Sequence, residues 1–382
     1  MDYELERTHR EYKESLEAFL VERIAPVAAE LERADAAVKC VTTRSVIRSL
    51  GEAGFLSPFR EDGGLDLVRH CLAAEAVSRL SPSVFLGARA SAFLCAGAFH
   101  LFGNDGQKRR YVEGLVTGSS VGALAYSERG AGSDLASAAA SARAQGDAWV
   151  LEGTKDIVVN APCADVFVVL AGGGNAGPSL FIVERGARGL VTDRLVETLG
   201  MKGALVGEVR MEGCGSLGIV GSKPGCGLDQ TNSLLSMGAV GIAGMCVGIS
   251  RACMEISTVH ARERTAFGRP IGMYQDIGFK LADMYTLVDL SRMLALRAAW
   301  AFDTGGTDAY VLASCAKLFA SEAASRVVNW GMQIFAGHGY IAGTDIERLY
   351  RDAKFGEICE GTSEILRDSI ATVELDRFAA RM

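Results

Sequence analysis

The sequence predicts an α+β protein made of a helical region, a β region and a second helical region. Residues 1–120 carry apolar side chains at helical spacing, whereas residues 121–227 consist of short β-rich runs between glycine-rich turns. In residues 228–382 helical patterns return, and several run longer than about 25 residues. A chain of 382 residues accommodates two or three packed units at about 150 residues each. We therefore expect one domain in each of these three ranges.

The first region has a regular apolar stripe. Pro58 and the pair Gly63–Gly64 interrupt it, and helical patterns resume through LAAEAVSRL and SAFLCAGAFHLF, which ends before Gly103–Asn104. Spacings of three, four and one predict a buried helix face formed by Leu16, Phe19, Leu20, Ile24, Val27 and Leu31.

The β region has no helix-length pattern between its strands, so it predicts an antiparallel domain and not a βαβ array. Its expected strands are SVGALAYS, AWVLEGTKDIVV, DVFVVLA, SLFIVE, GLVTDRLV and VGEVRMEG. Two stretches match the dinucleotide pattern GxGxxG, namely GGGNAG from Gly172 and GCGSLG from Gly213. Neither precedes a helix that could hold a pyrophosphate, so we interpret both as hairpin or loop glycines.

The third region predicts a bundle of long helices, whose patterns cover residues 234–264, 274–303 and 309–337. Gly241, Gly244 and Gly248 recur along one face of the first of these helices. We expect them to permit close helix–helix packing; the alternative is a ligand lying against the bare backbone.

Composition excludes several classes of partner and indicates the cellular compartment. The net charge of −7 argues against nucleic acid or an anionic membrane as a partner. The ten cysteines lack CxxC or secreted-type spacing, and the charged N-terminus is no signal peptide, which together predict a soluble cytoplasmic protein. The most apolar run, Met237–Ile249, is shorter than the ~20 residues of a membrane span.

The histidines form no metal or triad spacing, and HExxH and GxSxG are missing, so no metal or hydrolytic chemistry is expected. His338, in the glycine-flanked AGHGY, can face a ligand. We expect the other histidines to be structural or solvated: His9, His70, His100 and His260.

Glu360, in ICEGTSEIL, lies between apolar or thiol neighbours and a turn-forming Gly-Thr-Ser. It is either a surface charge at a helix N-terminus or a partly desolvated base. The residues alone leave both interpretations open.

Four further stretches are weak separately but specific together: YSERGAGSDL (126–135), RERTAFGRPIGMYQ (262–275), QIFAGHGY (333–340) and YRDAKFGEICEGTSEILR (350–367). In this order and spacing, and with GNDGQKRRYVEGLVTG at the end of the first region, the chain resembles the acyl-CoA dehydrogenase flavoproteins over nearly its whole length. The resemblance implies an N-terminal helical domain, a middle β domain and a C-terminal four-helix bundle. It also implies FAD between the β domain and the bundle, and a homodimer or homotetramer that completes the flavin site.

The resemblance assigns roles to individual residues. Glu360 matches the catalytic base, and Ser133 matches a contact to the phosphopantetheine arm of the substrate. The implied FAD contacts are Ser127, Arg264, Phe267, Gln275, Gln333, Gly337 and Thr362, of which Arg264, Phe267 and Gln275 hold the diphosphate and adenine end in a neighbouring subunit.

The implied chemistry explains why a carboxylate is used. Removing the α-proton of a thioester needs a base that is neither solvated nor already protonated, and an apolar pocket moves a carboxyl pKa toward neutrality. We expect Ile358 and Cys359 to supply that apolar wall. Flavin N5 accepts hydride from the β-carbon, while a backbone N–H and a ribityl hydroxyl stabilise the charge on the thioester oxygen.

The chain departs from the family pattern at several positions. Ile157 and Val159 replace the usual Trp-x-Thr beside the flavin, so flavin potential and oxygen reactivity are expected to differ. Ala239 stands where the family commonly has an arginine that holds acyl-CoA. The alternative base position of some branches falls on Gly238, which leaves Glu360 as the candidate base.

We therefore favour an acyl thioester tethered to a carrier protein, as in polyketide and non-ribosomal peptide (antibiotic) pathways. The alternatives are a catabolic dehydrogenase of CoA esters, a flavin oxidase or monooxygenase on the same fold, and a relative that has lost the flavin. The expected electron acceptor is an electron-transfer flavoprotein or oxygen.

Overall fold

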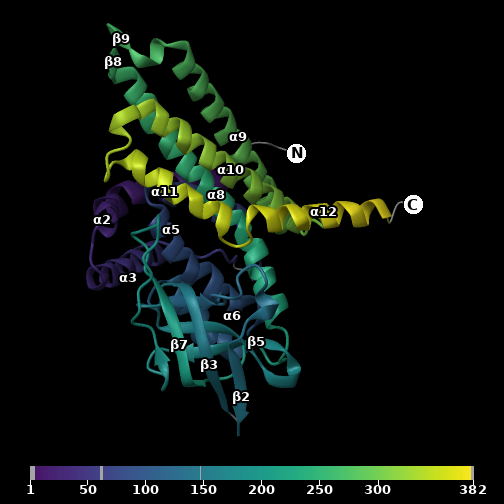
Figure 1. Cartoon of the computed structure of the whole chain (residues 1–382). Helices are drawn as coiled ribbons and strands as arrows, with labels where there is room; N and C mark the ends of the chain where they lie inside the picture. Colours follow the sequence, from purple (N-terminus) through teal and green to yellow (C-terminus); the bar gives the residue numbers. More distant parts are fainter. Residues whose placement is uncertain (1–4, 61–62, 147, 380–382) are drawn as a thin grey trace.

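The computed structural model describes residues 5–60, 63–146 and 148–379 and follows the predicted order of helices, sheet and helices (Figure 1). The ends of the first and last predicted domains, residues 1–4 and 380–382, lie outside the described residues. In Figure 1 the sheet lies at one end of the molecule and the long helices at the other. The first helical region contacts both of them, since α4 (Leu67–Leu80) packs on the bundle helices and η2 (Ala90–Cys95) packs on strand β1 (Gly122–Ala125).

The first region begins with a nearly continuous helical run that carries the predicted apolar stripe. Its helices start at side-chain caps, because Asp35, Asp66 and Ser81 each accept a hydrogen bond from the backbone N–H three residues later. Asn104 and Gln107 form a reciprocal capping box. The helices are α1 (Arg7–Phe19), π-helical η1 (Leu20–Ile24), α2 (Ala25–Leu31), α3 (Ala36–Glu52), α4 (Leu67–Leu80), α5 (Pro82–Arg89), π-helical η2 (Ala90–Cys95), α6 (Ala96–Phe102) and α7 (Asp105–Val116).

The sheet is mixed and not purely antiparallel as expected. Its order is β1-β4-β2-β3-β7-β6, with β5 on β4, and β1 pairs parallel to β4. The parallel pairing arises because both strands start at one point, where Asp165 N donates to Val121 O and the Asp165 carboxylate accepts from Val121 N. The strands are β1 (Gly122–Ala125), β2 (Ser141–Gln145), β3 (Ala148–Val159), β4 (Val166–Gly172), β5 (Pro178–Glu184), β6 (Leu190–Val191) and β7 (Val206–Ser216).

Strand β2 was not predicted because SARAQ alternates polar residues only with alanines, which have low β propensity, and contains no β-branched or aromatic residue. The predicted GLVTDRLV strand shrinks to the two residues of β6. GGGNAG forms the β4–β5 hairpin, in which Gly173 N donates to Gly177 O, and GCGSLG starts in β7 and ends in a loop. The interpretation as hairpin or loop glycines is therefore confirmed for GGGNAG, whereas GCGSLG begins inside a strand.

The C-terminal region consists of long helices, as expected. Helix α8 contacts α4, α9, α10 and α11, and a small hairpin joins α8 to α9. The elements are α8 (Gly227–Glu263), β8 (Thr265–Ala266), β9 (Arg269–Pro270), α9 (Gln275–Asp303), α10 (Ala309–Phe335), α11 (Asp345–Ile358) and α12 (Ser363–Ala379), with short 3₁₀ turns η5 (Ile271–Met273) and η6 (Ala336–His338).

Two helical stretches, Pro82–Phe102 and Gly227–Glu263, are long and apolar enough to cross a membrane by composition. The most apolar window of each is 89% buried inside the protein, so both are core helices. Length was therefore the wrong argument against a membrane span at Met237–Ile249, because this run belongs to a helix of 37 residues.

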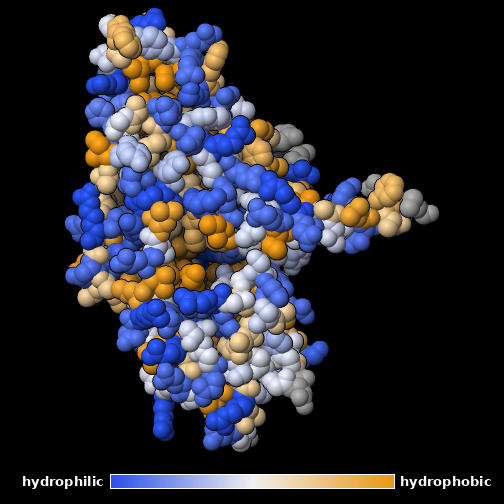
Figure 2. Space-filling model, in the orientation of Figure 1, coloured by the Kyte–Doolittle hydropathy of each residue, from blue (hydrophilic) through white to orange (hydrophobic). Residues whose placement is uncertain are grey.

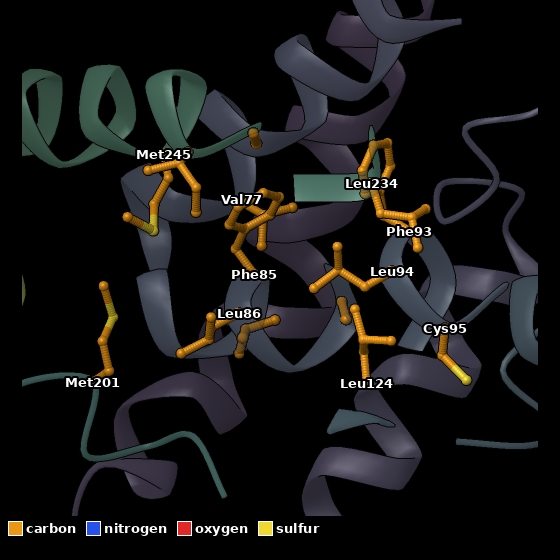
Figure 3. Close-up of a cluster of buried hydrophobic side chains, with 14 of the residues drawn as sticks. Val77, Phe85, Leu86, Phe93, Leu94, Cys95, Leu124, Met201, Leu234 and Met245 are labelled. Atoms are coloured by element: carbon orange, nitrogen blue, oxygen red, sulfur yellow. The ribbon is translucent and has the colours of Figure 1, made fainter. Parts of the chain in front are cut away.

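One apolar core joins the three regions. Figure 3 shows side chains from α4, α5, η2, β1, α8 and the loop before β7 gathered in one cluster: Val77, Phe85, Leu86, Phe93, Leu94, Cys95, Leu124, Leu234, Met245 and Met201. Asp352 of α11 binds the loop before β7, since its buried carboxyl accepts a hydrogen bond from Met201 N at 2.6 Å. Burial raises the pKa of Asp352 to about 6. The β domain and the bundle are thus held in one fixed relation around the residues between them.

Candidate active site

Glu360 lies in a tight turn between α11 and α12. Its φ is +51° and that of Gly361 is +95°. A positive φ is uncommon for a residue with a side chain, so neighbouring contacts must hold the turn. Buried Lys317 of α10 donates to Gly361 O at 2.6 Å. The turn points Glu360 inward, where its side chain is 4% exposed, so it is not a surface charge.

Arg89, the last residue of α5, holds both oxygens of Glu360. Its Nη1 donates to Oε1 and its Nη2 to Oε2, each at 2.5 Å. The Arg89 side chain is 1% exposed. The only sequence signal for Arg89 was a single charge inside the apolar run FLGARASAFLC, and motif reasoning passed over it.

The expected apolar wall around Glu360 is therefore incorrect. Ile358 turns outward and is 58% exposed, because it ends α11 on the solvent side. Cys359 does lie against the carboxylate. Burial raises the pKa of its thiol, and the negative charge of Glu360 raises it further. Glu360 is thus desolvated beside a thiol, but a guanidinium and not a hydrocarbon faces its carboxylate.

The glycines of α8 make room for this ion pair. A Cβ on Gly238 would lie 2.2 Å from Arg89 Nη2 and 2.8 Å from Glu360 Oε2. A Cβ on Gly241 would lie 2.5 Å from His70 Nε2 and 3.2 Å from Arg89 Nε. The packing expectation is confirmed: Gly244 and Gly248 meet the backbone of α4, and Gly241 meets the side chains of His70 in α4 and Arg89 in α5.

His70 of α4 is buried beside Arg89. Its ring stacks on Phe93 with centroids 4.2 Å apart. Burial, and then the positive charge of Arg89, lower the pKa of His70 to about 3, so the imidazole is neutral at physiological pH. His70 is therefore structural, as expected, but its neighbour is the residue that binds Glu360.

The loop after β1 brings Tyr126 and Ser127 to the same junction. Burial raises the pKa of Tyr126, and the charge of Glu360 raises it further, so this phenol stays protonated. Buried Lys155 of β3 donates to Tyr126 O at 3.1 Å and to Glu128 Oε1 at 2.7 Å. These bonds fix the start of the GAGSD loop, at whose tip Ser133 is exposed.

A cleft of about 610 Å³ lies beside this loop. It brings Ser127 together with Ile157, which is 60% exposed. A register shift between Lys155 and Val158 turns Ile157 outward while Val158 is buried. The lining residues are Ser127, Glu128, Arg129, Asp156, Ile157, Arg194, Leu195, Val196, Glu197 and Glu208. Figure 2 shows a hollow, bordered by apolar residues, where the bundle meets the β domain.

Thr362 lies beside Glu360 in the turn before α12, whereas the remaining five predicted FAD contacts lie at the opposite end of the bundle. Arg264 follows α8, Phe267 is at the tip of the β8–β9 hairpin with 96% exposure, and Gln275 starts α9. Gln333 and Gly337 lie near them, since His260 at the end of α8 stacks on Phe335 with centroids 4.1 Å apart. Figure 1 places the hairpin far from the β domain. The chain therefore carries two separate groups of predicted residues.

Models of the acyl-CoA dehydrogenase family match nearly the whole chain. The N-terminal domain model matches residues 6–119, the middle domain model residues 123–214 and the C-terminal domain model residues 225–375. The chain belongs to the acyl-CoA dehydrogenase family. It is 34% identical to the mouse (Mus musculus) mitochondrial short-chain specific acyl-CoA dehydrogenase over 378 residues, which cover 96% of this chain and 90% of the mouse protein.

Two solved structures superpose closely on the chain. Butyryl-CoA dehydrogenase from Megasphaera elsdenii has a TM-score of 0.90 at 28% identity, covering 98% of this chain and 100% of the other. PigA, solved with FAD and proline, has a TM-score of 0.90 at 25% identity, covering 99% and 100%. As an acyl-CoA dehydrogenase family member, this chain is an FAD-dependent oxidoreductase acting on the CH–CH bond of acyl thioesters.

The cleft of this family member fits part of an FAD molecule. Exposed Ile157 and Leu195 provide an apolar wall beside the Ser127 hydroxyl, and the volume is in the range of cofactor pockets. Glu360 is not among the residues that line this cleft. Glu360 and this cleft are therefore distinct parts of the junction.

Proposed function

We propose that this chain dehydrogenates an acyl thioester held on a carrier protein, as a cytoplasmic enzyme of secondary (antibiotic) metabolism, with Glu360 as the base. The observation that carries the proposal is the burial of the Glu360 carboxylate at the junction of bundle and β domain. A desolvated carboxylate can take the α-proton, provided that one of its oxygens is free to approach it. FAD, when bound, accepts the hydride that leaves the β-carbon.

The chain's own residues position the reactants. Ser127 borders the cleft and would contact the flavin ring, while Thr362, two residues after Glu360, would contact FAD from the bundle side. Lys155 binds Tyr126 O and the Glu128 carboxylate, and this carboxylate accepts from the backbone N–H of Ala139 and Ala140, so both ends of the 128–140 loop are tied together. Ser133 lies at the exposed edge of this loop, where the pantetheine arm would enter.

Position 239 supports a carrier-protein tether. Ala239 is buried in α8, so it offers neither a charge nor a hydrogen bond to a CoA nucleotide. PigA, which superposes on this chain, was solved with FAD and proline, which is an amino acid and not a CoA ester. The catabolic alternative, a CoA ester, is favoured by the sequence relatives, since the mouse relative is named as an acyl-CoA dehydrogenase.

Matched substrates separate these two readings. Anaerobic holoenzyme is mixed with one acyl group presented either on CoA or on a phosphopantetheinylated carrier protein, and flavin absorbance is followed. We expect bleaching to be at least about tenfold faster with the carrier-bound thioester. Bleaching with the CoA ester alone would contradict the tether.

The electron acceptor is identified by reoxidation. After anaerobic reduction, either air or an electron-transfer flavoprotein is admitted. Because Val159 donates no side-chain hydrogen bond, we propose oxygen as an acceptor, and slow reoxidation in air would count against it.

We propose that a second copy completes the FAD site. Phe267 and Gln275 are far from Ser127 within one chain, so one FAD reaches both groups only if a neighbouring subunit supplies the hairpin end. Helix α12 extends away from the body (Figure 1) and exposes Leu375 and Phe378, which suits contact with another subunit. A homodimer is the smallest assembly that provides this.

Subunit mixing tests the shared site. In the proposed dimer each site takes Glu360 from one subunit and Gln275 from the other. The Glu360→Gln homodimer should therefore be inactive, and the Gln275→Ala homodimer should be deficient in FAD. A heterodimer, purified through two different tags, contains one site with both changes and one with neither. We expect activity to return in the heterodimer, because the twofold arrangement restores one intact site. If it stays inactive while its FAD content is normal, the contacts come from a single chain.

A further inference from the structure

Arg89 is a buried cation beside the proposed base, and an unsubstituted acyl chain has no group that a cation could bind. Its guanidinium is within 2.5 Å of both Glu360 oxygens and its Cζ lies 5.5 Å from the Phe93 ring centroid. Removing a guanidinium from water is costly, and replacing a buried ion pair by apolar residues is often neutral or stabilising. An apolar acyl group gains no hydrogen bond from a guanidinium at this position. The charge therefore calls for a reason other than stability.

The surroundings of Arg89 leave polar capacity unused. Within the described part of the chain, Arg89 Nε and His70 Nε2 are buried without a hydrogen-bond partner. Gly238 and Gly241 have no side chain precisely where these groups and Glu360 converge. Two unsatisfied polar atoms beside a paired carboxylate favour a polar group of the substrate over an alkyl chain at this point of the junction.

Distance limits where that polar group lies on the substrate. To take the α-proton, a Glu360 oxygen must reach hydrogen-bond distance of the α-carbon's hydrogen. Arg89 donates to those same oxygens at 2.5 Å. A substituent on the α- or β-carbon is therefore within reach of the guanidinium, whereas the end of a long chain is not.

We propose that Arg89 selects an acyl group that carries an acceptor oxygen, a hydroxyl or a carboxylate, at its α- or β-carbon. This inference rests on the proposed thioester dehydrogenation. It also answers a problem of that proposal, because a carboxylate with both oxygens bound by Arg89 is a poor base. When the substrate oxygen accepts a hydrogen bond from Arg89, one Glu360 oxygen is released toward the α-proton.

The test compares acyl groups on S-pantetheine thioesters, because this arm is common to CoA and carrier proteins. Butyryl, 2-hydroxybutyryl, 3-hydroxybutyryl and succinyl thioesters are bound to the holoenzyme. Their Kd is measured from the concentration dependence of anaerobic flavin reduction, or by calorimetry where no reduction follows. We expect at least one oxygenated thioester to bind roughly tenfold or more tightly than butyryl. Preference for a hydroxyl or for succinyl identifies which oxygen is recognised.

Variants assign that preference to Arg89. In Arg89→Met the ratio between the Kd of butyryl and that of the preferred oxygenated thioester should fall to about one, whatever the loss of the buried ion pair does to both values. In Arg89→Lys the ratio should be reduced, because lysine lacks the planar guanidinium that donates two parallel hydrogen bonds. Arg79→Met, which removes a partly exposed partner of Glu255, should leave the preference unchanged. Equal or tighter butyryl binding by the wild type would overturn the inference without any variant, as would a preference that survives in Arg89→Met.

The two proposals fail in different ways. If butyryl reduces the flavin and binds best, the dehydrogenation stands and the role of Arg89 falls. If oxygenated thioesters bind through Arg89 but none reduces the flavin, recognition stands and the dehydrogenation falls.

Discussion

Glu360→Gln is expected to retain FAD but to slow flavin reduction by the acyl thioester about 10²- to 10⁴-fold, the usual contribution of a general base. The amide has the same shape but cannot accept the α-proton. It still accepts a hydrogen bond from Arg89, yet it leaves that buried guanidinium without its counter-charge, so some loss of stability is also expected. Stopped-flow absorbance under anaerobic conditions measures the reduction, and the flavin spectrum after gel filtration measures retention.

Glu364→Gln is the matched control, because Glu364 lies four residues further on, in the first turn of α12, and does not face Arg89. Its flavin reduction should equal that of the wild type. Reduction by the Glu360→Gln enzyme within a few-fold of the wild-type rate would remove Glu360 from the role of base, whatever its burial.

Gly248→Ala is expected to lower the free energy of unfolding by about 1–3 kcal/mol or more, through overpacking. A Cβ at this position would lie 2.4 Å from Glu75 O and 2.8 Å from Arg79 N. Both are backbone atoms of α4, so α8 and α4 must separate, and no side-chain rotation can relieve the contact. The change outweighs the ~1 kcal/mol that alanine normally gains over glycine in a helix.

Urea unfolding followed by circular dichroism, at fixed protein concentration, measures this loss. Gly106→Ala provides the comparison, since Gly106 is exposed in α7 and its Cβ would meet only the Asn104 side chain at 3.3 Å. We expect its midpoint to move by less than the equivalent of about 1 kcal/mol. If the two variants unfold at the same urea concentration, the close contact between α8 and α4 is not a determinant of stability.

Periodicity predicted the long helices well, because an amphipathic pattern is local and α8, α9 and α10 each repeat it over many turns. It missed β2, which contains no β-branched or aromatic residue, and it could not decide that β1 pairs parallel to β4. Strand pairing depends on which segments meet across the sheet, and the Asp165–Val121 contact that aligns these two is a tertiary one.

By itself, the sequence determined the order of the three domains, the family through its ordered motifs, and Glu360 as the candidate base. Each of these is carried by residues close together in the chain. Only the tertiary structure decided what faces Glu360, because Arg89 is 271 residues away in sequence and no local pattern links them. It also decided that Gly238 and Gly241 accommodate an ion pair and a histidine, since a missing side chain acquires meaning only from the atoms that fill its place.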